Sequence, residues 1–198
     1  MTVGQESRPP ACRHAARTTG RRALLTAAAG VGLAMRPARA QSDAARTRPQ
    51  EGDLLVRSGS TDLTPLMAQS LSPDGSPIMA WPYDPAAKLV RDGSRLNKVL
   101  LLRLEPSGLN EPTAQRAAEG VVAYSAICPH TGCEVVSWHA DTQLLECPCH
   151  NSLYDPKAAA RVVSGPTPRS LAALPLRIAN GNLEVAHPFI GRLGIQQM

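Results

Sequence analysis

Aromatic residues and long apolar runs are scarce in this chain of 198 residues. Only 3% of the residues are Phe, Trp or Tyr, although 43% are hydrophobic, and the chain has 15 Gly and 18 Pro. This composition excludes a long helical bundle or coiled coil and favours a compact, loop-rich domain with an aliphatic core. No run of about 18 uncharged apolar residues occurs, which excludes a multi-span membrane protein.

Basic residues are concentrated at one end of the chain. The formal net charge is +5, but residues 1–40 alone hold seven Arg against one acid, so residues 41–198 carry 14 basic and 15 acidic side chains. The basic excess therefore belongs to an N-terminal block. The rest of the chain lacks a basic-aromatic pattern, a phosphate loop and a nucleophile–base signature. We therefore expect no nucleic-acid partner.

Residues 1–40 have the layout of an export signal and resemble a twin-arginine signal peptide. Arg21-Arg22 precedes a modestly apolar stretch, and Ala38-Arg39-Ala40 precedes Gln41. Small residues three and one positions before the break suit a signal peptidase. We expect export to the periplasm with a cofactor already inserted, followed by a linker at 41–50. The alternative is an uncleaved amphipathic anchor, which would associate the protein with a membrane.

The mature chain predicts an all-β fold over residues 51–198. Short apolar runs separated by Gly and Pro turns favour a small antiparallel sandwich or barrel. Residues 60–96 are interpreted as an irregular insertion, with a short helix near 62–70 and a turn at Trp81-Pro82. Expected strands are Asp53–Arg57, Lys98–Leu104, Gly120–Ile127, Glu134–Trp138, Gln143–Cys147, Pro175–Ile178 and Leu183–Ala186, the last two joined by an Asn-Gly hairpin turn.

Two short clusters of cysteine and histidine dominate the rest of the sequence. The first is Cys128-Pro129-His130-Thr131-Gly132-Cys133, and the second is Cys147-Pro148-Cys149-His150-Asn151-Ser152. Two loops of this kind can surround one inorganic centre. Two Cys and two His suit tetrahedral zinc, and they also suit a binuclear iron–sulfur cluster. The remaining two cysteines could form a disulfide in an oxidising compartment.

The two clusters resemble the Rieske motif, and the similarity extends over about residues 121–186. The resemblance implies a Rieske-type antiparallel β-sandwich or barrel, with a small cluster-binding subdomain formed by two loops around a 2Fe-2S cluster. It implies Cys128 and Cys147 as thiolate ligands and His130 and His150 as imidazole ligands. The resemblance also implies a disulfide between Cys133 and Cys149, and hydroxyl bonds from Ser152 to a bridging sulfide and from Tyr154 to a ligand-cysteine sulfur. It implies a covering loop at Gly165, Pro166, Thr167 and Pro168.

The ligand set also predicts the redox behaviour. Two ferric ions, two sulfides and two thiolates sum to zero charge, and neutral imidazoles leave that sum unchanged, so adding an electron is easier than in a four-thiolate cluster. Rieske centres accordingly lie at about −150 to +300 mV. Hydroxyl donors and the disulfide favour the positive end of that range.

The resemblance predicts an electron-transfer subunit rather than a complete enzyme. Our first interpretation is the small subunit of a periplasmic oxidoreductase, such as a molybdopterin enzyme of the arsenite-oxidase type, passing electrons toward a cytochrome c. The alternative is the Rieske subunit of a cytochrome bc complex, with cytochrome b as partner. Thr131 stands where quinol-oxidising Rieske subunits usually carry a leucine, and Asn151 replaces a usual glycine.

Two further classes fit less well. Oxygenase Rieske domains lack the disulfide cysteines, and the chain is too short for a catalytic iron domain as well. A zinc module would leave two cysteines without a role. Residues 120–150 contain no Lys or Arg but do contain Glu134, Asp141 and Glu146. This pattern fits a basic docking partner such as a cytochrome c, and it equally fits an ordinary solvated face.

Overall fold

The computed structural model describes Met1 and residues 38–195. Residues 2–37, which hold most of the expected signal segment with its paired arginines, lie outside the described residues. Helix α1 (Ala38–Arg46) is the first described element. Within the described part of the chain, no helix has the length and hydrophobicity that crossing a bilayer requires.

The larger sheet contains seven antiparallel strands. Its strand order is β10-β11-β1-β2-β4-β5, and β3 pairs with β2 off this path. The core of the sheet is the pairing of β4 with β5 over five residue pairs, from Val99 with Ser125 to Arg103 with Val121. The strands are β1 (Leu54–Arg57), β2 (Ile78–Asp84), β3 (Leu89–Val90), β4 (Val99–Arg103), β5 (Val121–Ser125), β10 (Leu176–Ala179) and β11 (Asn182–Val185).

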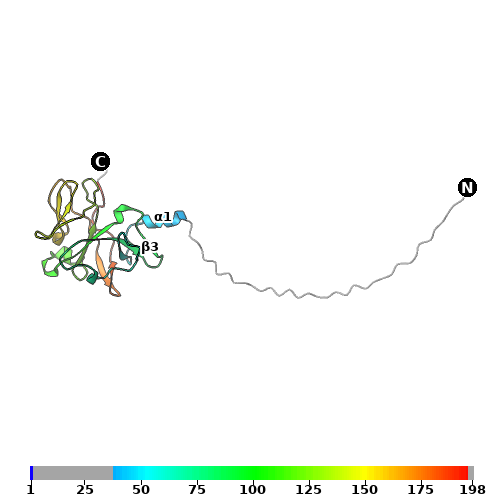
Figure 1. The fold of residues 1–198 in the computed structure, drawn as a ribbon, viewed down its shortest axis with the longest axis horizontal. Coiled ribbons are helices and arrows are strands. Elements are labelled where there is room, and N and C mark those ends of the chain that lie inside the picture. Colours follow the sequence, from blue (N-terminus) through cyan, green and yellow to red (C-terminus); the bar gives the residue numbers. More distant parts are fainter. Residues whose placement is uncertain (2–37, 196–198) are drawn as a thin grey trace. The chain divides into compact units, whose positions relative to one another are not determined.

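The smaller sheet is a four-stranded antiparallel meander in the order β6-β7-β8-β9. Its strands are β6 (Ser137–His139), β7 (Leu144–Cys147), β8 (Ser152–Asp155) and β9 (Arg161–Ser164). They form the yellow group that stands apart from the green and orange strands of the larger sheet (Figure 1). All-β architecture with a small separate subdomain, as the sequence predicts, is therefore confirmed.

Helical structure is limited to short segments that connect the strands. Besides α1, the one α-helix in the described residues is α2 (Glu111–Ala114), whose first turn is capped by the Asn110 side chain accepting a hydrogen bond from the Thr113 amide. The other helical segments are single 3₁₀ turns, η1 (Ala68–Ser70), η2 (Arg95–Asn97), η3 (Pro106–Gly108) and η4 (Pro156–Ala158).

Strand β4 is buried on both faces and so contributes to two separate apolar cores. Val99 and Leu101 face the first core, which lies within the larger sheet and its loops. Leu100 and Leu102 face the second core, which the larger sheet shares with the smaller one through residues such as Tyr154. Because successive side chains of a strand point to opposite faces, one short strand joins the two lobes of the domain.

The prediction that residues 60–96 are irregular is wrong in part, because this segment contains β2 and β3. Trp81-Pro82 predicted a turn, but Pro82 lies inside β2, opposite Leu55 of β1. Its carbonyl accepts a hydrogen bond from the Arg91 amide. Along this edge of β2, β4 pairs as far as Ala80 and β3 begins at Tyr83, so the missing N–H of Pro82 falls in the gap. The helix expected near 62–70 is reduced to η1.

The segment expected to be a linker, residues 41–50, is attached to the larger sheet. Gly93 N–H donates to the carbonyl of Ala45 at 3.1 Å, and the Asn97 side chain donates to the carbonyl of Thr47 at 2.8 Å. The buried Arg91 guanidinium binds the Asp53 carboxylate, with an N–O distance of 2.6 Å. It also binds the Asp84 carboxylate, with an N–O distance of 3.1 Å. The end of this segment is therefore part of the folded domain.

Candidate metal centre

The first Cys-His cluster forms a tight loop directly after β5. This first loop, residues 128–133, is closed by the Cys128 amide donating to the carbonyl of Cys133 at 2.8 Å and by the Gly132 amide donating back to the carbonyl of Cys128 at 3.1 Å. Gly132 has φ +82°, a conformation that favours glycine. The loop therefore turns sharply enough to bring both of its cysteines and His130 to one end of the domain.

The second cluster forms the hairpin turn between β7 and β8. In this second loop, residues 147–152, Cys147 pairs with Ser152 across the two strands. Asn151 adopts φ +53°. Asn is one of the few residues with a side chain that tolerate this left-handed conformation. The departure from the usual glycine is thereby accommodated without moving the ligand candidates.

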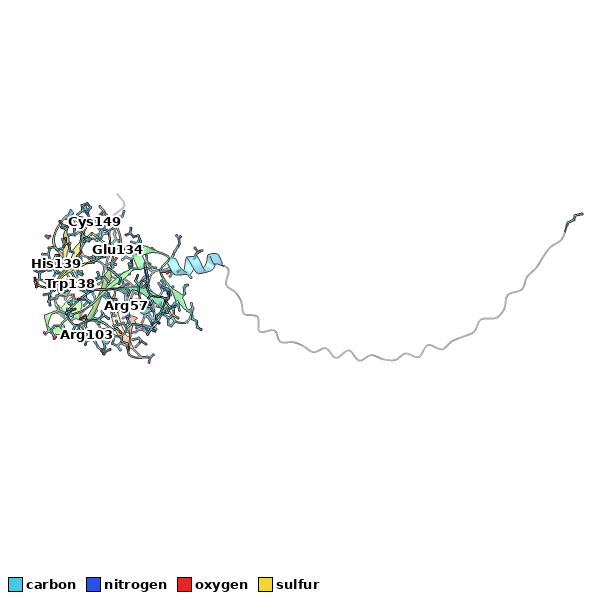
Figure 2. The ribbon with its side chains drawn as sticks, viewed as in Figure 1. Arg57, Arg103, Glu134, Trp138, His139 and Cys149 are labelled. Carbon is cyan, nitrogen blue, oxygen red and sulfur yellow. A yellow bond between two sulfur atoms is a disulfide. The ribbon has the colours of Figure 1, made fainter. Side chains whose placement is uncertain are left out.

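The two loops are joined by a disulfide and by facing imidazoles. Cys133 and Cys149 form a disulfide bond, which confirms the pairing that the Rieske resemblance implies. Figure 2 shows Cys149 at one end of the domain, with Arg57 and Arg103 well away from it. The Nδ1 atoms of His130 and His150 lie 3.2 Å apart, and the two rings meet edge to face with their centroids 4.5 Å apart. The Nδ1 atoms of both histidines therefore face one common position.

The two remaining cysteines are buried free thiols. Cys128 is 1% exposed and Cys147 is 2% exposed, whereas His150 is exposed. Burial raises the pKa of the Cys147 thiol, and the neighbouring Cys128 adds to the increase, while backbone N–H groups of Cys149 and His150 oppose it. The site therefore has an inner end of sulfur and an outer end of imidazole nitrogen.

Ser152 supports a cofactor between these ends. Its side chain is fully buried, and its Oγ has no hydrogen-bond partner among the described residues. A buried hydroxyl without a partner costs free energy, so an acceptor from a bound group is expected at this position. The sulfide of an iron–sulfur cluster is such an acceptor. Zinc bound by the same four ligands would bring none.

The third loop, residues 165–168, closes over the second. Gly165 has φ +95°, and a Cβ atom there would lie 2.5 Å from Ser152 Cα, so only glycine allows this close approach. The buried Tyr154 hydroxyl donates to Thr167 Oγ1 at 3.0 Å and lies 3.1 Å from Cys128 Sγ. Burial raises the Tyr154 pKa, and the contact with Cys128 raises it further. Tyr154 therefore stays protonated, and its single O–H is the donor to Thr167.

The sequence did not reveal the cations that approach the first loop. Arg95 donates a hydrogen bond from Nη2 to the carbonyl of Gly132 at 2.6 Å. Lys98 pairs with Glu134 at 2.9 Å, and His139 contacts Glu146. Residues 120–150, which contain no Lys or Arg of their own, therefore do have basic neighbours, namely Arg95 of η2 and Lys98, which directly precedes β4. No local signal could have shown this, since the pairs lie 36 or 37 residues apart.

Comparison with known proteins identifies the domain. A family model described as the Rieske [2Fe-2S] domain matches residues 100–175. The chain carries a Rieske domain. Its cofactor is a Rieske 2Fe-2S cluster, and the chain is an electron-transfer protein. This match covers β4, β5, the whole smaller sheet and all three loops, so the Rieske domain includes every ligand candidate named above.

Similar curated proteins are iron-sulfur subunits of cytochrome complexes. The cytochrome bc1 complex Rieske iron-sulfur subunit of Streptomyces lividans is 36% identical over 93 residues, which are 46% of this chain and 55% of that protein. The subunit of the same name from Corynebacterium glutamicum is 34% identical over 161 residues, 75% of this chain and 37% of that protein. The chain thus spans about half or less of these relatives.

Among solved structures, the ferredoxin of carbazole 1,9a-dioxygenase from Nocardioides aromaticivorans matches 71% of this chain and 99% of its own. The TM-score is 0.42 and the sequence identity is 19%.

Proposed function

We propose that the chain is the Rieske iron–sulfur subunit of a cytochrome bc-type complex, accepting electrons from quinol and passing them to a cytochrome c. The observation that carries this proposal is the similarity to named cytochrome bc1 Rieske subunits. It favours the alternative of our sequence interpretation over a small subunit of a periplasmic molybdopterin oxidoreductase. Cytochrome b and a c-type cytochrome are then the expected partners.

Within this function, the two cysteines and the two histidines of the ligand loops have separate roles. Cys128 and Cys147 would hold the cluster as thiolate ligands, and His130 and His150 would hold it as imidazole ligands through Nδ1. The 3.2 Å approach of the two Nδ1 atoms supports this choice of nitrogen, because it leaves Nε2 of each ring pointing away from the shared place. The cluster supplies one-electron transfer when it is bound.

The ligand cysteines and histidines differ in exposure, and this difference indicates where an electron would leave the site. The cysteines are buried, His130 is half-buried and His150 is exposed. The imidazole end is therefore the part of the site that a partner can approach most closely.

Purification from washed membranes tests the proposed function. We expect the chain to be retained in the membrane and, after solubilisation in mild detergent, to copurify with b-type and c-type haem and with quinol:cytochrome c reductase activity. A Cys147→Ala variant should lose that activity while the haems remain. Release of a haem-free Rieske protein in the soluble fraction would reject the proposal.

A second candidate is the small subunit of an exported oxidoreductase. Thr131 favours it, because the exposed threonine, with its Oγ1 3.6 Å from Cys133 Sγ, replaces the apolar side chain usual in quinol-oxidising subunits. The twin-arginine pattern at Arg21-Arg22 would then be a cleaved signal directing the protein to the periplasm. N-terminal sequencing separates the two candidates, since mature protein beginning at Gln41 in a soluble periplasmic fraction supports this one.

A further inference from the structure

A surface pocket far along the chain from the ligand loops contains three arginines and no acid. It has a volume of about 280 Å³ and lies where three segments meet. Arg116 comes from the turn after α2, Arg169 from the end of the third loop and Arg192 from the C-terminal segment. The other lining residues are small, apolar or hydroxyl-bearing, so nothing in the pocket wall offsets the positive charge.

These arginines lack the carboxylate partners that three other arginines of the domain have. Arg91 binds Asp53 and Asp84, Arg161 binds Asp155, and Arg177 binds Glu51 and Glu184. In contrast, no acidic side chain of the described residues lies within ion-pair distance of any of the three pocket arginines (Arg116, Arg169 and Arg192).

Arg169 is the only one of the three with a side-chain hydrogen bond within the described part of the chain. Its Nη2 donates to the carbonyl of Gly194, and its Nε is buried without a partner. One N–H group of Arg169 thus holds the C-terminal segment, whereas the guanidinium N–H groups of Arg116 and Arg192 have no hydrogen-bond partner among the described residues. Their guanidinium groups remain available to a ligand that enters the pocket.

The pocket has a fixed floor and small side chains that keep it open. Ala173 and Ile190 exchange two backbone hydrogen bonds, of 2.9 and 2.7 Å, which fix the C-terminal segment against the segment that follows the third loop. Gly191 has φ +105°, and a Cβ atom there would lie 3.4 Å from Ala172 Cα. The arginines are therefore presented around a preformed hollow of small residues.

We propose that this pocket binds a phosphate-type oxyanion, either as free phosphate or as the headgroup of an anionic phospholipid. Guanidinium groups bind phosphate oxygens through paired N–H donors, and several of them match the several charged oxygens of one phosphate. A carboxylate could satisfy one arginine but would leave the others unpaired. This site is separate from the ligand loops and does not depend on the proposed membership of a bc-type complex.

Titration calorimetry of the full-length protein with inorganic phosphate at low ionic strength tests the site. We expect millimolar or tighter binding that weakens at least tenfold in the Arg116→Gln/Arg192→Gln double variant. Arg169 is left in place because it holds the C-terminal segment. Arg57→Gln is the matched control, since Arg57 is an exposed arginine of β1 without an ion pair. Its binding should equal that of the parent.

Soluble short-chain phospholipids distinguish the two sources of phosphate. Tighter binding of dihexanoyl phosphatidylglycerol than of phosphate, lost in the double variant and absent with dihexanoyl phosphatidylcholine, assigns the site to a lipid headgroup. Tighter binding of phosphate assigns it to the free anion. The proposal is overturned if neither probe binds the parent protein, or if the double variant and Arg57→Gln bind as well as each other.

Discussion

The two sheets of this domain are stabilised by different means. The larger sheet pairs strands far apart in sequence, such as β1 with β11, and is backed by an aliphatic core that includes Leu55, Leu101 and Leu183. The smaller sheet pairs only neighbouring strands. Its core is completed by the larger sheet, and its loops are joined by the disulfide Cys133–Cys149 and by hydroxyl contacts.

This difference separates folding from cofactor chemistry. The larger sheet can fold from side-chain packing alone, because its apolar residues bury one another. The smaller sheet exposes both ligand loops and depends on covalent and polar links near the cluster. Changes in the larger sheet should therefore alter the free energy of unfolding, and changes in the loops should alter the cluster.

Adjacent leucines of β4 test this separation most strongly. Leu100 and Leu101 are both fully buried, but they face the second and the first core respectively. Truncation of either to Ala should lower the free energy of unfolding by about 2–5 kcal/mol, measured by urea denaturation. Only Leu100→Ala should also speed loss of the visible absorption of the cluster in native buffer. Equal rates of cluster loss in both variants would contradict the division into two cores.

Removal of the disulfide should affect the smaller lobe alone. The bond joins residues 16 positions apart, and closing a loop of this size stabilises by about 3 kcal/mol. In the Cys133→Ser/Cys149→Ser variant, we expect the cluster to be lost at a lower urea concentration than the β-sheet circular dichroism signal. The parent should lose both signals together. Simultaneous loss in the variant would show that the two lobes unfold as one unit.

Ser152→Ala should change the reduction potential without removing the cluster. The Ser152 hydroxyl is buried without a protein partner, so we expect it to donate to the cluster and stabilise the added electron. Protein-film voltammetry should give a potential above zero for the parent and a lower potential for the variant, at unchanged iron content. An unchanged potential would remove Ser152 from the network.

Arg95→Gln should also lower the reduction potential of the cluster, but by less than Ser152→Ala. Arg95 places a positive charge on the carbonyl of Gly132 in the first loop, which favours the reduced cluster. Because Arg95 is exposed, salt should screen this effect, and the shift should be larger at low ionic strength. Arg57→Gln is the control. A shift that is independent of salt would point to a structural effect of the substitution instead of its charge.

The sequence predicted the site better than the strand order. Cys128, His130, Cys147 and His150 lie in two short clusters whose spacing is specific, so local sequence was sufficient to identify the two loops, and the role of these residues as ligands stays a prediction. Strand β2 was missed because Trp81-Pro82 has the local pattern of a turn. Its strand conformation results from pairing with β1 and β4, which a local pattern does not contain.

Contacts between distant segments also escaped the sequence analysis. Residues 120–150 contain no Lys or Arg, but Arg95 of η2 and Lys98, which directly precedes β4, contact them. Similarly, Tyr154 was expected to contact a ligand cysteine, while its donation to Thr167, which ties the third loop to β8, was not foreseen.

Pulsed EPR of the reduced protein tests the central claim most directly, because it counts the nitrogen atoms bound to the cluster. We expect two strongly coupled histidine nitrogens in the parent and in His139→Ala, a matched control whose imidazole contacts Glu146. We expect their loss, with loss of the cluster, in His130→Ala and His150→Ala. A parent signal without coupled nitrogen, or the parent signal retained in His150→Ala, would contradict a cluster bound by two cysteines and two histidines.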